Sequence, residues 1–267
     1  MTEEELILTS VLDCDRIALY TQPRSLTPEQ EEYLTEIKQR RAQGEPLQYI
    51  LGFCEFMGFK FFVDQRVLIP RPETELLVEE AVTAARRINT NEPLSILDLG
   101  AGSGNIAISL AKLIPGSAVT AVEVSQDAVE VIAGNAHLNE VTAHLKVICQ
   151  DMEKFLSDPS QGKFDFIVSN PPYIPSGAIG TLSREVQGEP RMALDGGEDG
   201  LDFYRVIVHA APKFLKAHGQ LLMEIGEDQR TSLEKICSEV QGFARIEFKP
   251  DLCGRDRIII LELNSKH

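Results

Sequence analysis

The sequence lacks the features of a secreted, metal-binding or membrane-spanning protein. Its five cysteines are an odd number and form no C-x-x-C pair, and its five histidines show no ligand spacing with them, so we predict no metal. No leader with an apolar core follows Met1, and the longest apolar runs, such as residues 258–261, fall far short of the roughly 18 residues that a bilayer requires. We therefore expect a soluble protein of the reducing cytoplasm, with no membrane contact.

Basic residues are scarce as well. The chain has 26 Lys and Arg against 41 Asp and Glu, a net charge of −15. This balance disfavours tight binding to a phosphate backbone, so no stable nucleic-acid binding is expected. What the chain does have is 267 residues with 43% apolar side chains, enough to bury the core of one large domain or two modest ones.

The first fifty residues read as short helices. Glycine is absent before Gly44, and apolar residues recur there at three- and four-residue spacing. One helix has a clear start, with Thr27 at the N-cap, Pro28 at the first helical position and Gln30 at the third. Two aromatic-rich runs follow over 53–63 and fit a β-hairpin.

From residue 94 onward, strand-like and helix-like stretches alternate. Alternation of this kind predicts an α/β fold, with a parallel sheet and helices on both of its faces. The last two strands have no room for a crossover helix between them, so they must pair antiparallel. The predicted strands are 95–99, 118–124, 145–149, 164–169, 220–225, 243–249 and 257–263, and the predicted helices are 105–113, 126–138, 201–216 and 229–240.

A glycine-rich turn follows the first of these strands. Glycines at alternate positions let the backbone pass beneath a ligand, and the helix that follows offers free N–H groups. The pattern is typical of a nucleotide-type ligand, although G-x-G-x-x-A by itself also matches a dinucleotide site. The turn contributes Gly100, Ala101, Gly102, Ser103 and Gly104 to the predicted cofactor site.

Acidic residues at the strand ends narrow the choice of ligand. Glu123 ends the second strand, where a carboxylate accepts both ribose hydroxyls of either NAD or S-adenosylmethionine. Asp98 favours S-adenosylmethionine, because it would attract a cationic methionine end and repel a pyrophosphate. Asp151 follows the third strand and reads equally well as an acceptor from the adenine amino group or as a helix N-cap, while Met152 would pack on the adenine ring.

The predicted chemical site is the tetrapeptide Asn170-Pro171-Pro172-Tyr173, which follows a buried strand at the edge where ligands bind in open α/β sheets. Asn170 has a side-chain carbonyl acceptor, Pro171 a main-chain acceptor, and Tyr173 an aromatic face. Two acceptors holding both hydrogens of a planar NH₂ group leave its nitrogen open to an electrophile. Pro-Pro-Tyr also occurs in ligands of WW domains, which is the competing interpretation.

These motifs, taken together, resemble a known family. The glycine turn and Asn-Pro-Pro-Tyr are similar to those of amino-group N-methyltransferases of the class I S-adenosylmethionine-dependent fold. The order of the motifs along most of the chain resembles, more specifically, the release factor glutamine methyltransferase family. They are Leu68-Ile69-Pro70-Arg71-Pro72-Glu73-Thr74-Glu75, Asp98 to Gly104, Ile167 to Ile174, Glu189-Pro190, and Glu224-Ile225-Gly226 with Gln229.

The resemblance implies a complete account of fold and function. The fold would be a Rossmann-like seven-stranded sheet with its last strand antiparallel. A helical substrate-recognition domain over 1–50 and a hairpin linker over 51–72 would precede the methyltransferase domain over 73–267. The enzyme would methylate the side-chain amide nitrogen of the glutamine in the Gly-Gly-Gln motif of peptide chain release factors.

The resemblance also assigns roles to residues. Gly100, Gly102, Gly104, Glu123, Met152 and Asn170 would line the cofactor, and Asn170, Pro171, Pro172 and Tyr173 would hold the glutamine. Asn170, Pro171 and Tyr173 are the expected catalytic residues. The acid usual in the family at position 123 is aspartate, one methylene shorter than the glutamate found here.

Three other functions compete with this one. An adenine N6-methyltransferase acting on DNA or RNA uses the same tetrapeptide on an exocyclic amino group, but its need to grip phosphates conflicts with the acidic charge. An NAD-dependent oxidoreductase explains the glycine turn and Glu123 but leaves residues 170–173 without a role. A non-enzymatic adaptor would bind the cofactor and turn nothing over.

Overall fold

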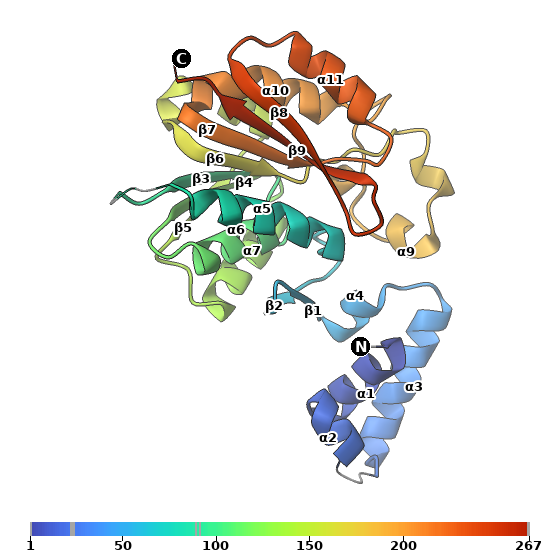
Figure 1. Ribbon diagram of the computed structural model, residues 1–267. Helices are drawn as coiled ribbons and strands as arrows, with labels where there is room; N and C mark the ends of the chain where they lie inside the picture. Colours follow the sequence, from blue (N-terminus) through green and yellow to red (C-terminus); the bar gives the residue numbers. More distant parts are fainter. Residues whose placement is uncertain (1, 22–24, 89, 91, 266–267) are drawn as a thin grey trace.

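The computed structural model describes residues 2–21, 25–88, 90 and 92–265. A twisted sheet with helices on both faces forms the larger part of the molecule. A group of helices from the start of the chain lies at one end of it, next to a small hairpin (Figure 1).

The amino-terminal helices pack around a small core of their own. The box that begins α3 is as predicted, because the Thr27 hydroxyl accepts from the N–H of Gln30 and the Gln30 side chain accepts from the N–H of Thr27. Ile37 is fully buried against Ile7 and Val11 of the first helix. The four helices are α1 (Glu3–Leu12), α2 (Arg16–Thr21), α3 (Pro28–Ala42) and α4 (Leu47–Leu51).

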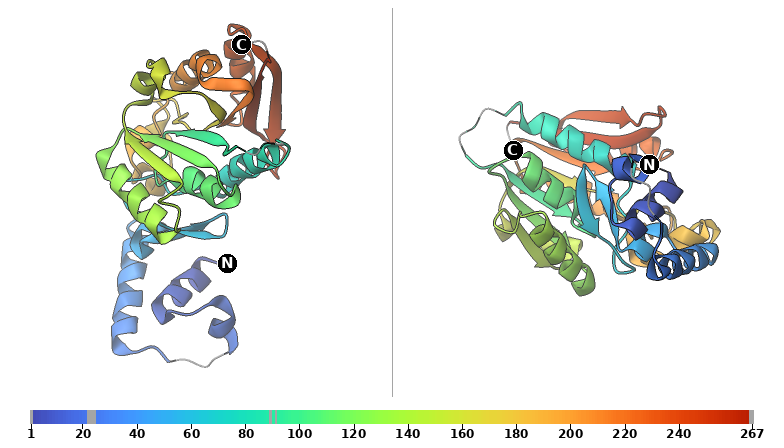
Figure 2. Two further views of the ribbon diagram at one scale, coloured as in Figure 1. Left: turned by 90° about the vertical axis from the view of Figure 1, so that its left-hand side faces the viewer. Right: turned by 90° about the horizontal axis from the view of Figure 1, so that it is seen from below.

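The predicted hairpin is confirmed as β1 (Phe53–Phe56) and β2 (Phe59–Phe62), which pair antiparallel. Met57 and Gly58 form its two-residue turn, and both have positive φ, as a turn between twisted strands requires. In the left view of Figure 2 the hairpin lies between the helices of residues 1–51 and the sheet. The division into segments 1–50, 51–72 and 73–267 stays a prediction.

The main sheet has seven strands in the order β5-β4-β3-β6-β7-β9-β8. Only β9 runs against its neighbours, as predicted. The largest boundary error lies between α10 and β7: α10 ends at Phe214 instead of residue 216, and β7 begins at Leu215 instead of residue 220. Other boundaries of the predicted strands and helices differ by at most two residues. Residues 216–219, Lys-Ala-His-Gly, show no strand-like alternation of apolar and polar side chains, and the β6–β7 pairing is irregular there. The strands are β3 (Ser95–Leu99), β4 (Ala118–Glu123), β5 (Leu145–Cys149), β6 (Phe164–Ser169), β7 (Leu215–Glu224), β8 (Phe243–Pro250) and β9 (Asp256–Leu263).

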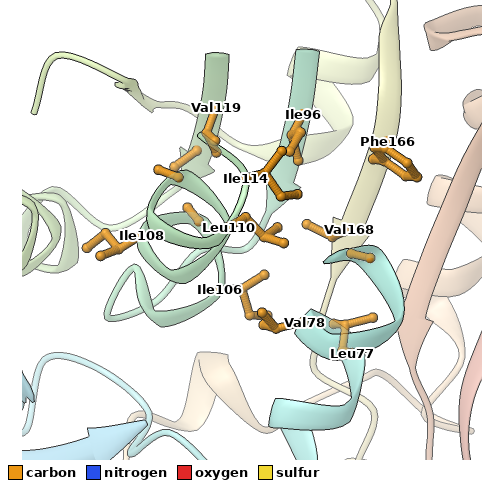
Figure 3. Packing of buried hydrophobic residues seen from close by; sticks show 14 of the residues in the cluster. Leu77, Val78, Ile96, Ile106, Ile108, Leu110, Ile114, Val119, Phe166 and Val168 are labelled. Carbon is orange, nitrogen blue, oxygen red and sulfur yellow. The ribbon is translucent and has the colours of Figure 1, made fainter. Parts of the chain in front are cut away.

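Two apolar cores hold the helices to the two faces of the sheet. On one face, Leu77 and Val78 of α5 and Ile106 and Leu110 of α6 pack toward Val168 of the central strand β6 (Figure 3). The other face is covered by α8, α10 and α11. These helices are α5 (Glu75–Ala85, preceded by the 3₁₀ turn η1, Pro72–Thr74), α6 (Asn105–Leu113), α7 (Gln126–Leu138), α8 (Met152–Leu156), α10 (Asp202–Phe214) and α11 (Arg230–Ser238).

The segment between β6 and α10 is long and mostly irregular. It contains the 3₁₀ turns η3 (Ile179–Thr181) and η4 (Arg191–Ala193) and the short helix α9 (Arg184–Gln187). The side chain of Glu185 in α9 accepts from Arg41 of α3 at 3.1 Å, which joins this segment to the amino-terminal helices. Among the described residues, no helix is both long enough and apolar enough to cross a bilayer.

The strand order sets the position of the site. The chain changes direction across the sheet between β3 and β6, and such a switch point opens a crevice at the carboxyl ends of the strands. Leu99 and Ser169 pair at this edge, and the Ser169 hydroxyl donates to the Leu99 carbonyl at 2.7 Å. The glycine turn and the Asn-Pro-Pro-Tyr segment therefore leave the sheet side by side.

Candidate active site

A hollow open to solvent occupies this crevice. Its floor is the glycine turn and the ends of β4 and β5, and its walls come from segments on either side of the switch point. Nine of the predicted site residues line it: Gly100, Ala101, Gly102, Ser103, Glu123, Asp151, Met152, Asn170 and Pro172. Gly104, Pro171 and Tyr173 do not line it, and the roles of all twelve residues stay predictions.

The three glycines of the turn have different tasks. All have positive φ (+74° at Gly100, +55° at Gly102 and +81° at Gly104), a region that other residues rarely adopt. A side chain at Gly102 would meet nothing within 4 Å, whereas one at Gly104 would press on Ile108 and Ile132. Gly102 therefore keeps the hollow open, while Gly104 lets α6 pack closely against α7.

Glu123 connects the end of β4 to the glycine turn. Its Oε2 accepts from the main-chain N–H of Gly102 at 2.8 Å, and its Oε1 accepts from that of Ser125 at 2.9 Å. Each carboxylate oxygen can accept two hydrogen bonds, so both keep capacity for a ligand hydroxyl. The residue lines the hollow, which fits the predicted role of a ribose acceptor.

Asp98 lies beneath the turn and does not line the hollow. Its side chain is fully buried, and Oδ2 accepts from the N–H of Ala107 in the first turn of α6 at 3.1 Å. Oδ1 has no hydrogen-bond partner among the described residues. Burial raises the pKa of Asp98 to about 7, partly offset by the Ala107 N–H. The predicted attraction of Asp98 for a cationic methionine end would therefore act from beneath the turn and stays a prediction.

Asp151 and Met152 occupy the end of the hollow next to β5. Asp151 is the N-cap of α8 and accepts from the N–H of Lys154 at 3.0 Å, and it also lines the hollow. The two interpretations of Asp151 are thus compatible. Met152 is 8% exposed, and its methyl group would lie 3.3 Å from a Cβ placed on Gly100, so it closes the apolar side of the site.

The Asn-Pro-Pro-Tyr segment follows β6 directly. Asn170 donates through Nδ2 to the hydroxyl of Thr74 at 3.1 Å, and Pro171 is buried. Tyr173 packs against the core beneath α10, and its hydroxyl donates to Glu224 at 3.2 Å. Burial, followed by the charge of Glu224, raises the pKa of this hydroxyl. A segment packed in this way does not have the exposed form of a WW-domain ligand.

An ion pair between buried Glu189 and partly exposed Arg71 joins two segments beside the hollow. Glu189 accepts from the guanidinium of Arg71 and from the main-chain N–H of Ile69 at 3.0 Å. Arg71 lines the hollow, as do Pro190 and Met192 on the segment that carries Glu189. The pair therefore joins two walls of the site that are 118 residues apart in sequence.

Two of the residues that shape the site had no predicted role. Thr74 lines the hollow and contacts Asn170. Its sequence motif, residues 68–75, contributes to the family resemblance but predicts no role for this side chain. Asn135 of α7 is fully buried and donates to the carbonyls of Ser103 in the glycine turn and Phe62 in the hairpin. A signal for Asn135 existed, because it is a polar residue on the apolar face of a helix, in line with Val131 and Ile132.

Comparison with known proteins covers both parts of the chain. The "Methyltransferase small domain" model matches residues 74–185, and the "PrmC N-terminal domain" model matches residues 2–52. Among solved structures, the ribosomal protein L11 methylase from Lactobacillus delbrueckii subsp. bulgaricus is similar in fold. Its TM-score is 0.53 at 22% identity, over 76% of this chain and 84% of that one.

Curated relatives match over nearly the whole length. The release factor glutamine methyltransferase of Geobacter sulfurreducens is 42% identical, over 96% of this chain and 87% of its own. That of Thermodesulfovibrio yellowstonii is 38% identical, over 97% and 91%. At this identity and coverage, the chain belongs to the release factor glutamine methyltransferase family.

Proposed function

We propose that this protein transfers a methyl group from S-adenosylmethionine to the side-chain amide nitrogen of the glutamine in the Gly-Gly-Gln motif of peptide chain release factors. The observation that carries the proposal is the position of Asn170. It follows the central strand at the switch point and borders the same hollow as the glycine turn. Family membership supports a protein glutamine as the acceptor over the exocyclic amine of adenine.

The residues of the hollow fit S-adenosylmethionine. Glu123 has acceptor capacity for ribose hydroxyls, and the Met152 side chain gives an apolar surface for adenine. Gly102 leaves open space above the turn. When bound, S-adenosylmethionine supplies an electrophilic methyl group on a sulfonium.

The protein's part in the reaction is geometric and electrostatic. The lone pair of an amide nitrogen is delocalised into its carbonyl, which makes the nitrogen a weak nucleophile. Asn170 Oδ1 and the Pro171 carbonyl would accept the two hydrogens of the glutamine NH₂, and these bonds strengthen as positive charge develops on the nitrogen. Holding the nitrogen in line with the methyl group adds the effective concentration of an oriented pair. The nitrogen would gain the methyl group as the methyl–sulfur bond breaks, and its proton would then leave to water, so no strong base is needed.

Charge and free cysteines support a proposed compartment and partner type. All five cysteines are free, which supports a reducing cytoplasm as the compartment. A net charge of −15 supports a protein partner and disfavours stable nucleic-acid binding.

A competition experiment with three substrates tests the proposal. The enzyme would be incubated with S-adenosylmethionine labelled in its methyl group, together with equal amounts of a release factor, adenine-containing DNA and adenine-containing RNA. We expect label on the release factor alone. Label on DNA or RNA, with none on the release factor, would replace the proposal with the adenine alternative.

A further inference from the structure

The side chain of Asn170 is held by hydrogen bonds that begin at a buried glutamate. Asn170 Nδ2 donates to Thr74 Oγ1 at 3.1 Å, and the Thr74 hydroxyl donates to Glu224 Oε2 at 2.5 Å. The three residues come from the end of β6, the turn η1 and the end of β7. Thr74 and Glu224 are each 1% exposed, so water does not compete for these bonds.

Glu224 is surrounded by donors. Its second oxygen, Oε1, accepts from the Tyr173 hydroxyl at 3.2 Å, and its main-chain carbonyl accepts from the Tyr204 hydroxyl at 2.8 Å. Burial raises the pKa of Glu224, while the Thr74 hydrogen bond, the charge of Arg257 and the Tyr173 hydrogen bond oppose that rise. Each carboxylate oxygen of Glu224 thus accepts a hydrogen bond from one hydroxyl group, Thr74 on Oε2 and Tyr173 on Oε1.

The hydrogen bonds between Asn170, Thr74 and Glu224 all donate toward Glu224. A threonine hydroxyl has a single hydrogen, and that of Thr74 is committed to Glu224. Thr74 can therefore only accept from Asn170, which must turn its NH₂ end toward Thr74. Asn170 Oδ1 then points the other way, and it has no hydrogen bond among the residues that the structure describes.

We propose that Thr74 and Glu224 are positioning residues that fix the Asn170 amide with its oxygen toward the substrate. The inference rests on the proposed function, because it explains how the site presents an acceptor to an NH₂ group. With the amide reversed, Asn170 would offer a donor to a group that itself donates. The fixed amide selects a glutamine side chain and rejects a glutamate carboxylate at the same position.

The test removes the Thr74 hydroxyl without changing the size of the side chain. Thr74→Val leaves the Asn170 amide free to turn, and we expect kcat to fall 10-fold or more. The KM for the release factor and the Kd for S-adenosylmethionine should stay within about threefold. Thr74→Ser keeps the hydroxyl and is the matched control, with kcat within about threefold of wild type. Thr74→Ala replaces the valine variant if thermal melting shows that the latter does not fold.

A double-mutant cycle separates positioning from a general structural effect. In an Asn170→Ala background the amide is absent, so Thr74→Val should cause no further loss of kcat. An equal fold-loss in both backgrounds, or wild-type kcat in Thr74→Val, would overturn the inference.

A second readout does not depend on activity. Hydrogen exchange of the Asn170 side-chain NH₂, assigned by its loss in Asn170→Ala, should be faster in Thr74→Val than in wild type or Thr74→Ser. Unchanged exchange in Thr74→Val would contradict positioning, even if the wild-type enzyme methylated no release factor. Absence of methyl transfer by wild type would count against the proposed function alone.

Discussion

The carboxylate of Glu123 accepts a hydrogen bond from the main-chain N–H of Gly102 at 2.8 Å, which joins the end of β4 to the middle of the glycine turn. The same side chain accepts from the N–H of Ser125 at 2.9 Å. One side chain therefore holds the turn in place and presents an acceptor to the proposed ribose. Removal of the Glu123 carboxylate should therefore weaken S-adenosylmethionine binding more than it slows methyl transfer.

We expect Glu123→Ala to weaken S-adenosylmethionine binding by about 10- to 100-fold, since hydrogen bonds to a charged group contribute about 1.5–3 kcal/mol. Glu123→Asp, which keeps the charge on a shorter side chain, should stay within about fivefold and serves as the control. Isothermal titration calorimetry with S-adenosylmethionine gives both values. Binding by Glu123→Ala within twofold of wild type would show that the carboxylate has no part in holding the ligand.

Asn170→Ala should lower kcat for release factor methylation by roughly 10² or more, because it removes an acceptor that acts on the developing charge. The Kd for S-adenosylmethionine should change by no more than a few fold. Steady-state kinetics and calorimetry on one preparation measure the two quantities. Near-normal turnover would remove Asn170 from the mechanism.

Much of this architecture was predictable from local pattern. The alternation of strands and helices predicted the sheet, and a capping box with a proline located the start of α3. Glycine spacing and strand-end position located nine of the residues that line the hollow. Hydrophobic periodicity and turn-forming residues act over a few neighbouring positions, so a short window of sequence is enough to predict these features.

What the sequence could not show are contacts between distant segments. Thr74 meets Asn170 across 96 positions, and Arg71 meets Glu189 across 118. Neither pair has a local signal, since tertiary packing alone brings these segments together. The start of β7 was missed for a different reason: the positive φ of His218 and the irregular pairing nearby interrupt its alternation.

Asp98 should make stability depend on pH. Its pKa is raised from 3.8 to about 7 in the folded protein, so the folded state holds this proton more tightly than the unfolded state does. Wild type therefore loses stability relative to Asp98→Asn as pH rises from about 4 to 7, with a slope approaching about 1.4 kcal/mol per pH unit. Urea unfolding of both proteins at several pH values in this window measures the difference. A difference that does not vary with pH would contradict the assignment.

The ion pair between Arg71 and Glu189 should contribute to the free energy of unfolding. Glu189→Ala leaves the Ile69 N–H and the Arg71 guanidinium without their partner, and we expect a loss of about 2 kcal/mol, below the 3–5 kcal/mol typical of fully buried pairs because Arg71 is partly exposed. Glu185→Ala breaks an exposed pair with Arg41 and should cost less than about 1 kcal/mol. Urea unfolding curves compare the two variants. Equal losses would show that Glu189 is no more important than a surface pair.

The most direct test of the central claim compares two release factors that differ in one residue. The purified enzyme would be incubated with S-adenosylmethionine and either an unaltered release factor or one whose Gly-Gly-Gln glutamine has been replaced, and intact masses would be recorded. We predict the addition of a single methyl group to the unaltered factor and none to the other. Equal methylation of both factors would contradict the account, as would no methylation of either by enzyme that binds the cofactor.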